Sequence, residues 1–155
     1  MSRRGVDRVA EIHAQRAAAM LESISQHGWT VQGHCITERL SVFYTVGLTA
    51  AGLPELACYG IDDVHAAAGL LDVAAGHMMQ RGELMPGDRI GGPAGYGELV
   101  IIDMDQTDDF IEVRRLYGMV MAARQVMWPD PAGKFPWQTV WSLGPVQPMA
   151  GEPPF

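Results

Sequence analysis

The chain is poor in cysteine, and its histidines show no metal-binding spacing. Only Cys35 and Cys58 occur among the 155 residues, and no CxxC motif is present, so neither a disulfide framework nor a structural zinc site is predicted. Two cysteines with this spacing are typical of buried thiols in a cytoplasmic protein. The five histidines form neither HxxxH nor HExxH, and no metal ligands are predicted.

Long apolar runs and positive charge are also scarce. No apolar run reaches 18 residues and the N-terminus lacks a signal peptide, so we expect a cytoplasmic protein with no membrane segment. Lys and Arg total 11 against 18 Asp and Glu, for a net charge of -7. This balance argues against nucleic acid as a partner, because such binding depends on Lys and Arg neutralising phosphates. We therefore expect a small molecule or another protein as the partner.

Helical periodicity appears in three segments of a chain long enough for one domain. His13 falls on the apolar stripe of the first segment, which predicts a core or interface imidazole, and Gly28 is placed to end that helix. Asp62 or Asp63 can cap the second helix, and Thr107 or Asp108 the third. On the second helix His65 and Asp72 lie two turns apart, so they could share a ligand or simply be surface residues. The predicted helices span residues 6–27, 63–81 and 108–117.

Strand-like segments rich in β-branched and aromatic residues fill much of the remaining chain. The fold class predicted is α+β, with a mainly antiparallel sheet of about five strands, two longer helices and one short helix. Residues 82–97 hold six glycines and are predicted to form a long loop, which could act as a lid. From residue 141 the tail is rich in Pro and Gly, and its last residues are predicted to be loose or to lie on a partner. The predicted strands span residues 29–36, 40–48, 55–61, 98–104 and 119–128.

A proline-stiffened corner follows the last predicted strand. Pro129 and Pro131 flank Asp130 and restrict its backbone, while Gly133 allows a turn. Trp128 and Trp137 are therefore presented from a stiff segment. Such a segment is either a lid that closes the hydrophobic core or one wall of a pocket.

Several separated motifs together resemble one family. They are Gly28-Trp29, Tyr44-Thr45-Val46-Gly47-Leu48, Pro54-Glu55-Leu56, Gln125 to Asp130, Gly133 to Trp137 and Gln147-Pro148. In this order they resemble the bacterial domain of unknown function DUF4262 over about residues 25–150. The resemblance implies a single cytoplasmic domain of bacterial or phage origin, and it implies no activity. It directs attention to motif side chains that can do more than fill space, namely Trp29, Tyr44, Thr45, Pro54, Glu55, Gln125, Trp128, Asp130 and Trp137.

If the central strands are neighbours, the polar members of this set could converge at one rim of the sheet, with the indoles as walls. Glu55 and Asp130 would then be the candidate catalytic carboxylates. Either could instead accept hydrogen bonds from turn amides and only fix the local backbone. The main hypothesis from sequence is thus a small-molecule pocket that could also be catalytic, with no cofactor specified.

The alternative is a protein interaction module, immunity-like or involved in host takeover, that uses the Met-rich second helix and the Pro-rich tail as contact surfaces and can form a homo-oligomer. A flavin-binding split barrel is a third hypothesis, based on the strand-rich order and the glycine loop.

Overall fold

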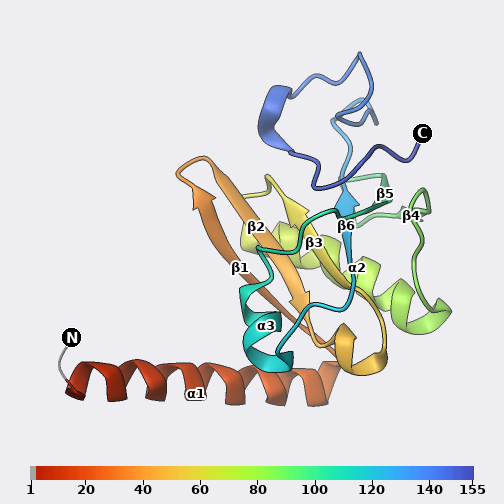
Figure 1. Ribbon diagram of the computed structural model, residues 1–155. Coiled ribbons are helices and arrows are strands. Elements are labelled where there is room, and N and C mark those ends of the chain that lie inside the picture. Colours follow the sequence, from red (N-terminus) through yellow and green to blue (C-terminus); the bar gives the residue numbers. More distant parts are fainter. Residues whose placement is uncertain (1–2) are drawn as a thin grey trace.

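The computed structural model describes residues 3–155 and contains one sheet with helices on both faces (Figure 1). The helices are α1 (Arg3–His27), α2 (Val64–Arg81) and α3 (Ile111–Tyr117). The strands are β1 (Thr30–Thr37), β2 (Leu40–Val46), β3 (Glu55–Tyr59), β4 (Arg89–Gly91), β5 (Glu98–Asp103) and β6 (Ala123–Met127). Two short 3₁₀ helices span Leu48–Ala51 and Gly144–Val146.

The sheet has the strand order β1-β2-β3-β6-β5-β4. The pair β3–β6 is parallel and every other pair is antiparallel. This arrangement confirms the α+β class and the mainly antiparallel sheet, with six strands instead of about five. The extra strand is β4, which lies inside the segment predicted to be a loop. It is only three residues long and its single buried residue is Ile90, so it leaves no alternating pattern in the sequence.

Alternation along the strands divides the core between the two faces of the sheet. In β3, Leu56 and Cys58 pack on the side covered by α2, whereas Ala57 and Tyr59 pack on the side of α1 and α3. The predicted cap of α2 is confirmed at Asp63, whose carboxylate accepts from the amides of His65 (2.8 Å) and Ala66 (3.3 Å). None of the helices described has both the length and the apolar character needed to cross a membrane.

Helix α1 extends well beyond the body of the protein. It ends where predicted, at Gly28, which has a φ of 93° and donates its N–H to the Ile24 carbonyl oxygen (2.8 Å). Only Met20 is buried, and the N-terminal half of the helix projects away from the sheet (Figure 1). We call residues 3–12 of this helix the arm. Its apolar side chains Val6 and Val9 are 52% and 42% exposed.

The C-terminal segment packs against the sheet through Gln147, Pro148 and Ala150. The Gln125 amide donates to the Pro148 carbonyl oxygen (2.7 Å) and accepts from the Ala150 N–H (2.7 Å). The Gln147 amide accepts from the Trp128 N–H (2.9 Å) and donates to the Trp128 carbonyl oxygen (2.8 Å). The two side-chain amides thus bond to backbone groups as a neighbouring strand would. The local sequence does not predict these contacts, because the partners are distant in the chain.

The prediction of two buried thiols is wrong for Cys35. Cys58 is buried in β3, and burial raises the pKa of its thiol to about 12. Cys35 is exposed on β1. Strand β1 lies at the edge of the sheet and its last three residues are exposed, so a strand-like residue type does not ensure burial there.

Gly60 permits the tail to approach the sheet closely. Its φ is 83°, and a Cβ added there would clash with the Val146 carbonyl oxygen. Replacing Gly60 by Ala should therefore lower the free energy of unfolding, measured by urea denaturation, by roughly 1–3 kcal/mol. The matched control is Gly76→Ala in α2, where an added Cβ meets no atom within 4 Å. That helical substitution should raise the free energy of unfolding by about 0.5–1 kcal/mol. Equal effects of the two substitutions would contradict this account of Gly60.

Candidate functional site

Glu55 holds the turn that follows β2. Its Oε1 accepts from Thr45 Oγ1 (2.9 Å) and the Leu48 N–H (3.2 Å). Its Oε2 accepts from the Gly47 N–H (3.2 Å), the Thr49 N–H (3.0 Å) and Thr49 Oγ1 (2.6 Å). Thr45 Oγ1 in turn accepts from the Leu56 N–H (2.8 Å). Both carboxylate oxygens are therefore engaged by the fold, and Glu55 is fully buried.

Asp130 plays a similar part in the proline corner. Its Oδ1 accepts from the N–H groups of Ala132 (2.9 Å) and Lys134 (2.8 Å), and its Oδ2 accepts from the N–H (3.0 Å) and hydroxyl (2.9 Å) of Ser142. Burial raises the pKa of Asp130, but the hydrogen bonds from Lys134, Ser142 and Ala132 outweigh it, so the net pKa lies below the usual 3.8. A carboxylate held ionised in this way fixes the corner and is a poor proton acceptor.

The structure does not bring Glu55 and Asp130 together. Strands β3 and β6 are parallel, and Glu55 pairs with Ala123, the first residue of β6. Asp130 follows Met127, the last residue of β6. The two carboxylates therefore lie at opposite ends of this strand pair, and the predicted convergence at one rim is wrong.

The remaining predicted residues of the corner are likewise occupied by packing. Trp128 Nε1 donates to the Tyr59 carbonyl oxygen (2.8 Å). Trp137 stacks on Phe135, with ring centroids 4.9 Å apart, and meets the edge of the Phe155 ring. These indoles pack against hydrophobic clusters of the core. This arrangement agrees with a segment that covers the core.

Trp29 lies on the α2 side of the sheet, far from the corner in the strand order. Its Nε1 donates to Asp72 Oδ1 (2.8 Å), and both residues line an open depression of about 570 Å³. Asp72, which the sequence suggested could share a ligand with His65, accepts this hydrogen bond from Trp29, and His65 is not among the residues lining the depression.

Tyr44, one of the residues singled out from the sequence motifs, lines a cleft. A cavity of about 360 Å³ lies between α1 and α3, and one of about 330 Å³ lies between α3, α1 and the β1–β2 hairpin. The two cavities share Glu112 and Arg115, and we call them together the Glu112 cleft. The first is lined by His13, Ala14, Ala17, Met20, Glu112, Arg115 and Leu116. The second is lined by Arg16, Gln32, Gly33, His34, Tyr44, Ile111, Glu112 and Arg115.

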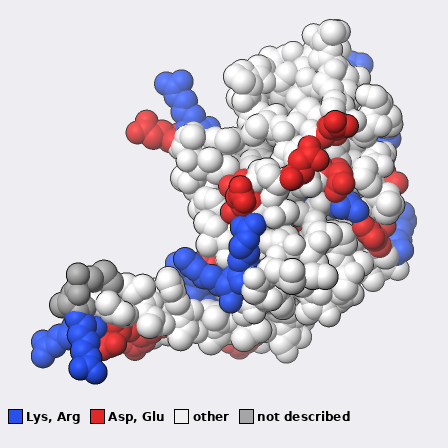
Figure 2. Space-filling view, in the orientation of Figure 1, with Lys and Arg blue, Asp and Glu red and all other residues white. Residues whose placement is uncertain are grey.

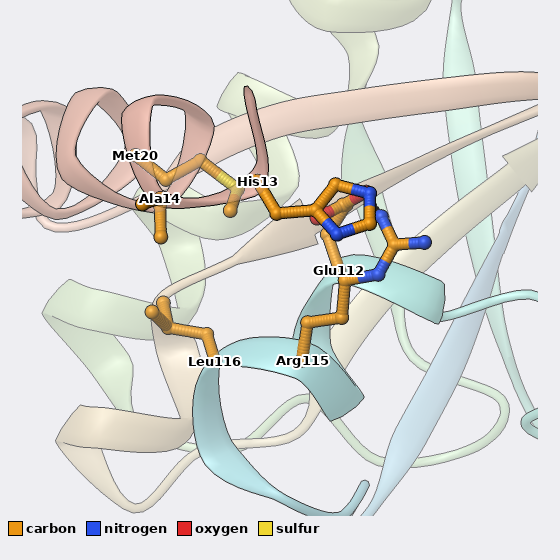
Figure 3. A pocket seen from close by; sticks show the side chains of 7 residues that line it. His13, Ala14, Met20, Glu112, Arg115 and Leu116 are labelled. Atoms are coloured by element: carbon orange, nitrogen blue, oxygen red, sulfur yellow. Dashed lines mark hydrogen bonds and ion pairs between the residues drawn. The ribbon is translucent and has the colours of Figure 1, made fainter. Parts of the chain in front are cut away.

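Figure 3 shows the walls of the first cavity, with Ala14, His13 and Met20 descending from α1 and Leu116, Arg115 and Glu112 rising from α3. In the space-filling view, basic side chains lie on α1 and in the hollow where α1 meets the body, with acidic side chains beside them (Figure 2). The lining of the cleft contains two arginines and one glutamate, a net positive charge on a protein of net negative charge.

Glu112 is the buried charge at the centre of the cleft, with 6% of its surface exposed. Its Oε1 accepts from Arg115 Nη1 (2.7 Å) and Arg16 Nη1 (3.2 Å). Its backbone N–H donates to the Tyr44 hydroxyl (3.1 Å). Burial, reinforced by the charge of Glu112, raises the pKa of Tyr44 even though the Glu112 N–H and the two arginines act against it. Tyr44 therefore keeps its hydroxyl proton at neutral pH.

Two histidines border the cleft. His13 lines the first cavity and His34 the second, and His34 Nε2 lies 3.9 Å from Asp109 Oδ1. The apolar stripe that includes His13 and the motif that includes Tyr44 were the sequence signals for this region. No sequence signal pointed to Glu112, Arg115 and Arg16, because a charged residue beside the apolar stripe of a helix is typical of an exposed surface. Within residues 3–155 no group of three His, Cys, Asp or Glu is placed to hold a metal ion.

These features define an α+β domain with a helix-bounded cleft on one face of a six-stranded mixed sheet. The chain belongs to the family described as Domain of unknown function (DUF4262), whose model matches residues 23–142, and this confirms the resemblance inferred from the sequence motifs. No curated protein and no solved structure matches the chain. The matched residues include Tyr44, Glu112 and Arg115, whereas most of α1 precedes them.

A structural role for Glu55 can be tested by making it neutral. In Glu55→Gln one carboxylate oxygen becomes an NH₂ group that faces hydrogen-bond donors, which leaves a buried donor unpaired. The free energy of unfolding measured in urea should fall by about 1–3 kcal/mol. The control Glu38→Gln, in the exposed β1–β2 turn, should be neutral. An unchanged stability for Glu55→Gln would show that these hydrogen bonds do not hold the turn.

Proposed function

We propose that this protein binds a small organic molecule in the Glu112 cleft. The observation that supports the proposal is a buried carboxylate, held by two arginines, in the shared wall of two adjoining cavities (Figure 3). Ligand sites are concave, largely preformed, and combine apolar walls with a few placed polar groups. The cleft combines apolar and polar side chains of this kind from α1, α3 and the β1–β2 hairpin.

The corner suggested by the sequence supports a ligand less well. A cavity of about 300 Å³ does lie there, between the glycine segment around Tyr96 and the turn from Pro129 to Gly133. Trp128 and Trp137 are not among its lining residues, and all the hydrogen bonds of Asp130 go to its own turn and to Ser142. The Glu112 cleft is therefore the preferred site, with Tyr44 retained from the predicted set.

In the proposal Glu112 is the counter-charge of the two arginines. Its Oε1 accepts from both arginines, so the two guanidinium groups lie together in the wall of the second cavity. The carboxylates first considered as general bases, Glu55 and Asp130, line neither of the two cavities. We accordingly propose binding as the function and assign no chemical step to these residues.

Filling the cleft should abolish ligand binding without unfolding the protein. Ala14 is exposed and lines the first cavity, so the indole of Ala14→Trp should occupy the space. Ala19 is exposed on the opposite side of α1 and lines neither cavity, which makes Ala19→Trp the matched control. In a thermal-shift screen with a panel of metabolites, the wild type and Ala19→Trp should be stabilised by the same compounds, and Ala14→Trp by none of them.

Two results of this screen would contradict the proposal. One is an identical response of Ala14→Trp and the wild type, which would place the ligand elsewhere. The other is a wild-type melting temperature that no compound in the panel raises, since bound ligand stabilises the folded state by mass action. Circular dichroism of each variant shows whether the fold is retained.

A second candidate function is protein interaction, favoured by the exposed apolar side of the arm. Helix α1 carries four arginines (Arg3, Arg4, Arg8, Arg16) against three acids (Asp7, Glu11, Glu22), a net charge of +1, and since the whole chain carries -7 the remainder carries -8. A positively charged helix and a negatively charged body on the same chain favour a second copy of this chain as the partner. Helix α2 is a weaker surface than the sequence suggested, because Met78 is fully buried.

Disrupting the apolar side of the arm should weaken this self-association. Native mass spectrometry of the wild type should show a dimer that the double variant Val6→Glu, Val9→Glu reduces by about tenfold in affinity, since each substitution places a charge where apolar surface is buried. The matched control is Gln15→Glu, Ala19→Glu, which adds the same charge on the opposite side of α1. A monomeric wild type at micromolar concentration, or equal weakening by both double variants, would exclude the arm as the contact surface.

A further inference from the structure

The Glu112 cleft has a polar end and an apolar end, and we propose that its ligand is an amphipathic organic anion, with a carboxylate or phosphate at the arginines and a short apolar group between α1 and α3. This inference rests on the proposed function and specifies the chemical class of the ligand. It does not depend on the arm or on self-association.

Positive charge exceeds negative charge at the polar end. Arg16 and Arg115 both direct Nη1 to one oxygen, Glu112 Oε1, so two cations face a single anion even with the histidines neutral. Within residues 3–155, Nη2 of neither arginine takes part in a hydrogen bond or ion pair. A guanidinium has five N–H donors in a planar fork that fits a carboxylate or phosphate. These two therefore have donors left for an anion.

Tyr44 supplies a third donor at the same end. Its hydroxyl oxygen accepts the Glu112 N–H, and within the described part of the chain the hydroxyl hydrogen has no acceptor. Tyr44 is 2% exposed and lines the second cavity. A buried O–H normally finds a partner, and the partner that suits three neighbouring donors is an oxygen that carries negative charge.

The other end of the cleft is apolar. Ala14, Ala17, Met20 and Leu116 line the first cavity together with His13, and Figure 3 shows Met20 and Leu116 facing the space between the two helices. At about 360 Å³ this cavity lies near the lower limit of small-ligand sites. It suits a short alkyl chain or a single ring, and the anionic group would lie next to the shared residues Glu112 and Arg115.

The ligand class can be tested with matched probes. We would titrate the full-length protein by calorimetry with 3-phenylpropionate, its neutral amide 3-phenylpropanamide, propionate and hexyl phosphate. The two amphipathic anions should bind, and the amide and propionate should bind at least about tenfold more weakly. The ratio between 3-phenylpropionate and hexyl phosphate distinguishes a carboxylate from a phosphate as the favoured head group.

Variants of the polar end should change affinity in opposite directions. Arg115→Gln should weaken binding of the anions about tenfold, whereas Glu112→Gln should strengthen it, because it removes the negative charge that competes for both guanidinium groups. A merely structural role of this cluster would lead to weaker binding in both variants. The control is Arg114→Gln on the same helix, whose guanidinium contacts Asp108 and Thr107 outside the cleft, and it should bind like the wild type.

Failure of this inference can be separated from failure of the proposed function. If the neutral amide binds as tightly as 3-phenylpropionate and Ala14→Trp abolishes its binding, the cleft binds small molecules but does not select anions. If Glu112→Gln weakens anion binding as Arg115→Gln does, the charge argument is wrong. If neither amphipathic anion binds the wild type at millimolar concentration, the proposed ligand class is excluded.

Discussion

The parallel pairing of β3 with β6 is the constraint on which the rest of the structure depends. It joins an antiparallel group, β1-β2-β3, to a second antiparallel group, β6-β5-β4, through the register of Glu55 with Ala123 and Ala57 with Gln125. A parallel pair requires a long crossover, and here the crossover contains α2, β4, β5 and α3. Helix α2 therefore covers one face of the sheet while α3 returns along the other, and the Glu112 cleft forms where α3 meets α1.

The two ends of this pair are closed by different polar groups. At the end where β3 and β6 begin, the Glu55 carboxylate gathers the donors of the turn after β2. At the end where β3 and β6 finish, the Asp130 carboxylate accepts hydrogen bonds from its own corner and from Ser142. Gln125 and Gln147 bond the tail to the sheet. Buried polar groups are stable only when they are hydrogen-bonded. The motif residues that looked most like a catalytic set thus serve two separate structural clusters.

Some features of the fold could be predicted from the sequence and others could not. Local signals were sufficient for the end of α1 and the start of α2, because Gly28 and Asp63 act through neighbouring backbone groups. The predicted cap of α3 at Thr107 or Asp108 is wrong, since the N-cap residue is Phe110 and no side chain caps this helix. Local signals also predicted β2 and β5, whose runs of β-branched, aromatic and other apolar residues are typical of strands. The sequence did not predict β4, which has three residues, or the parallel pair, since strand direction across a long crossover leaves no periodic trace. The prolines that flank Asp130 indicate a restricted backbone. They do not indicate whether the carboxylate oxygens face a ligand or, as here, Ser142 twelve positions away.

The Glu112 cleft could not be predicted from the sequence, because its walls come from segments that are far apart in the chain. Its polar wall, with Glu112, Arg115 and Tyr44, lies within the segment matched by the family model, whereas Ala14 and Arg16 on α1 lie outside it. Helix α1 buries only Met20, and a helix with so few tertiary contacts is marginal by itself. A ligand between α1 and α3 would add contacts to both helices, so occupancy of the cleft and anchoring of α1 are thermodynamically linked. Protection of the α1 amides from hydrogen exchange should consequently rise with ligand binding, because opening of α1 would then also require loss of the ligand.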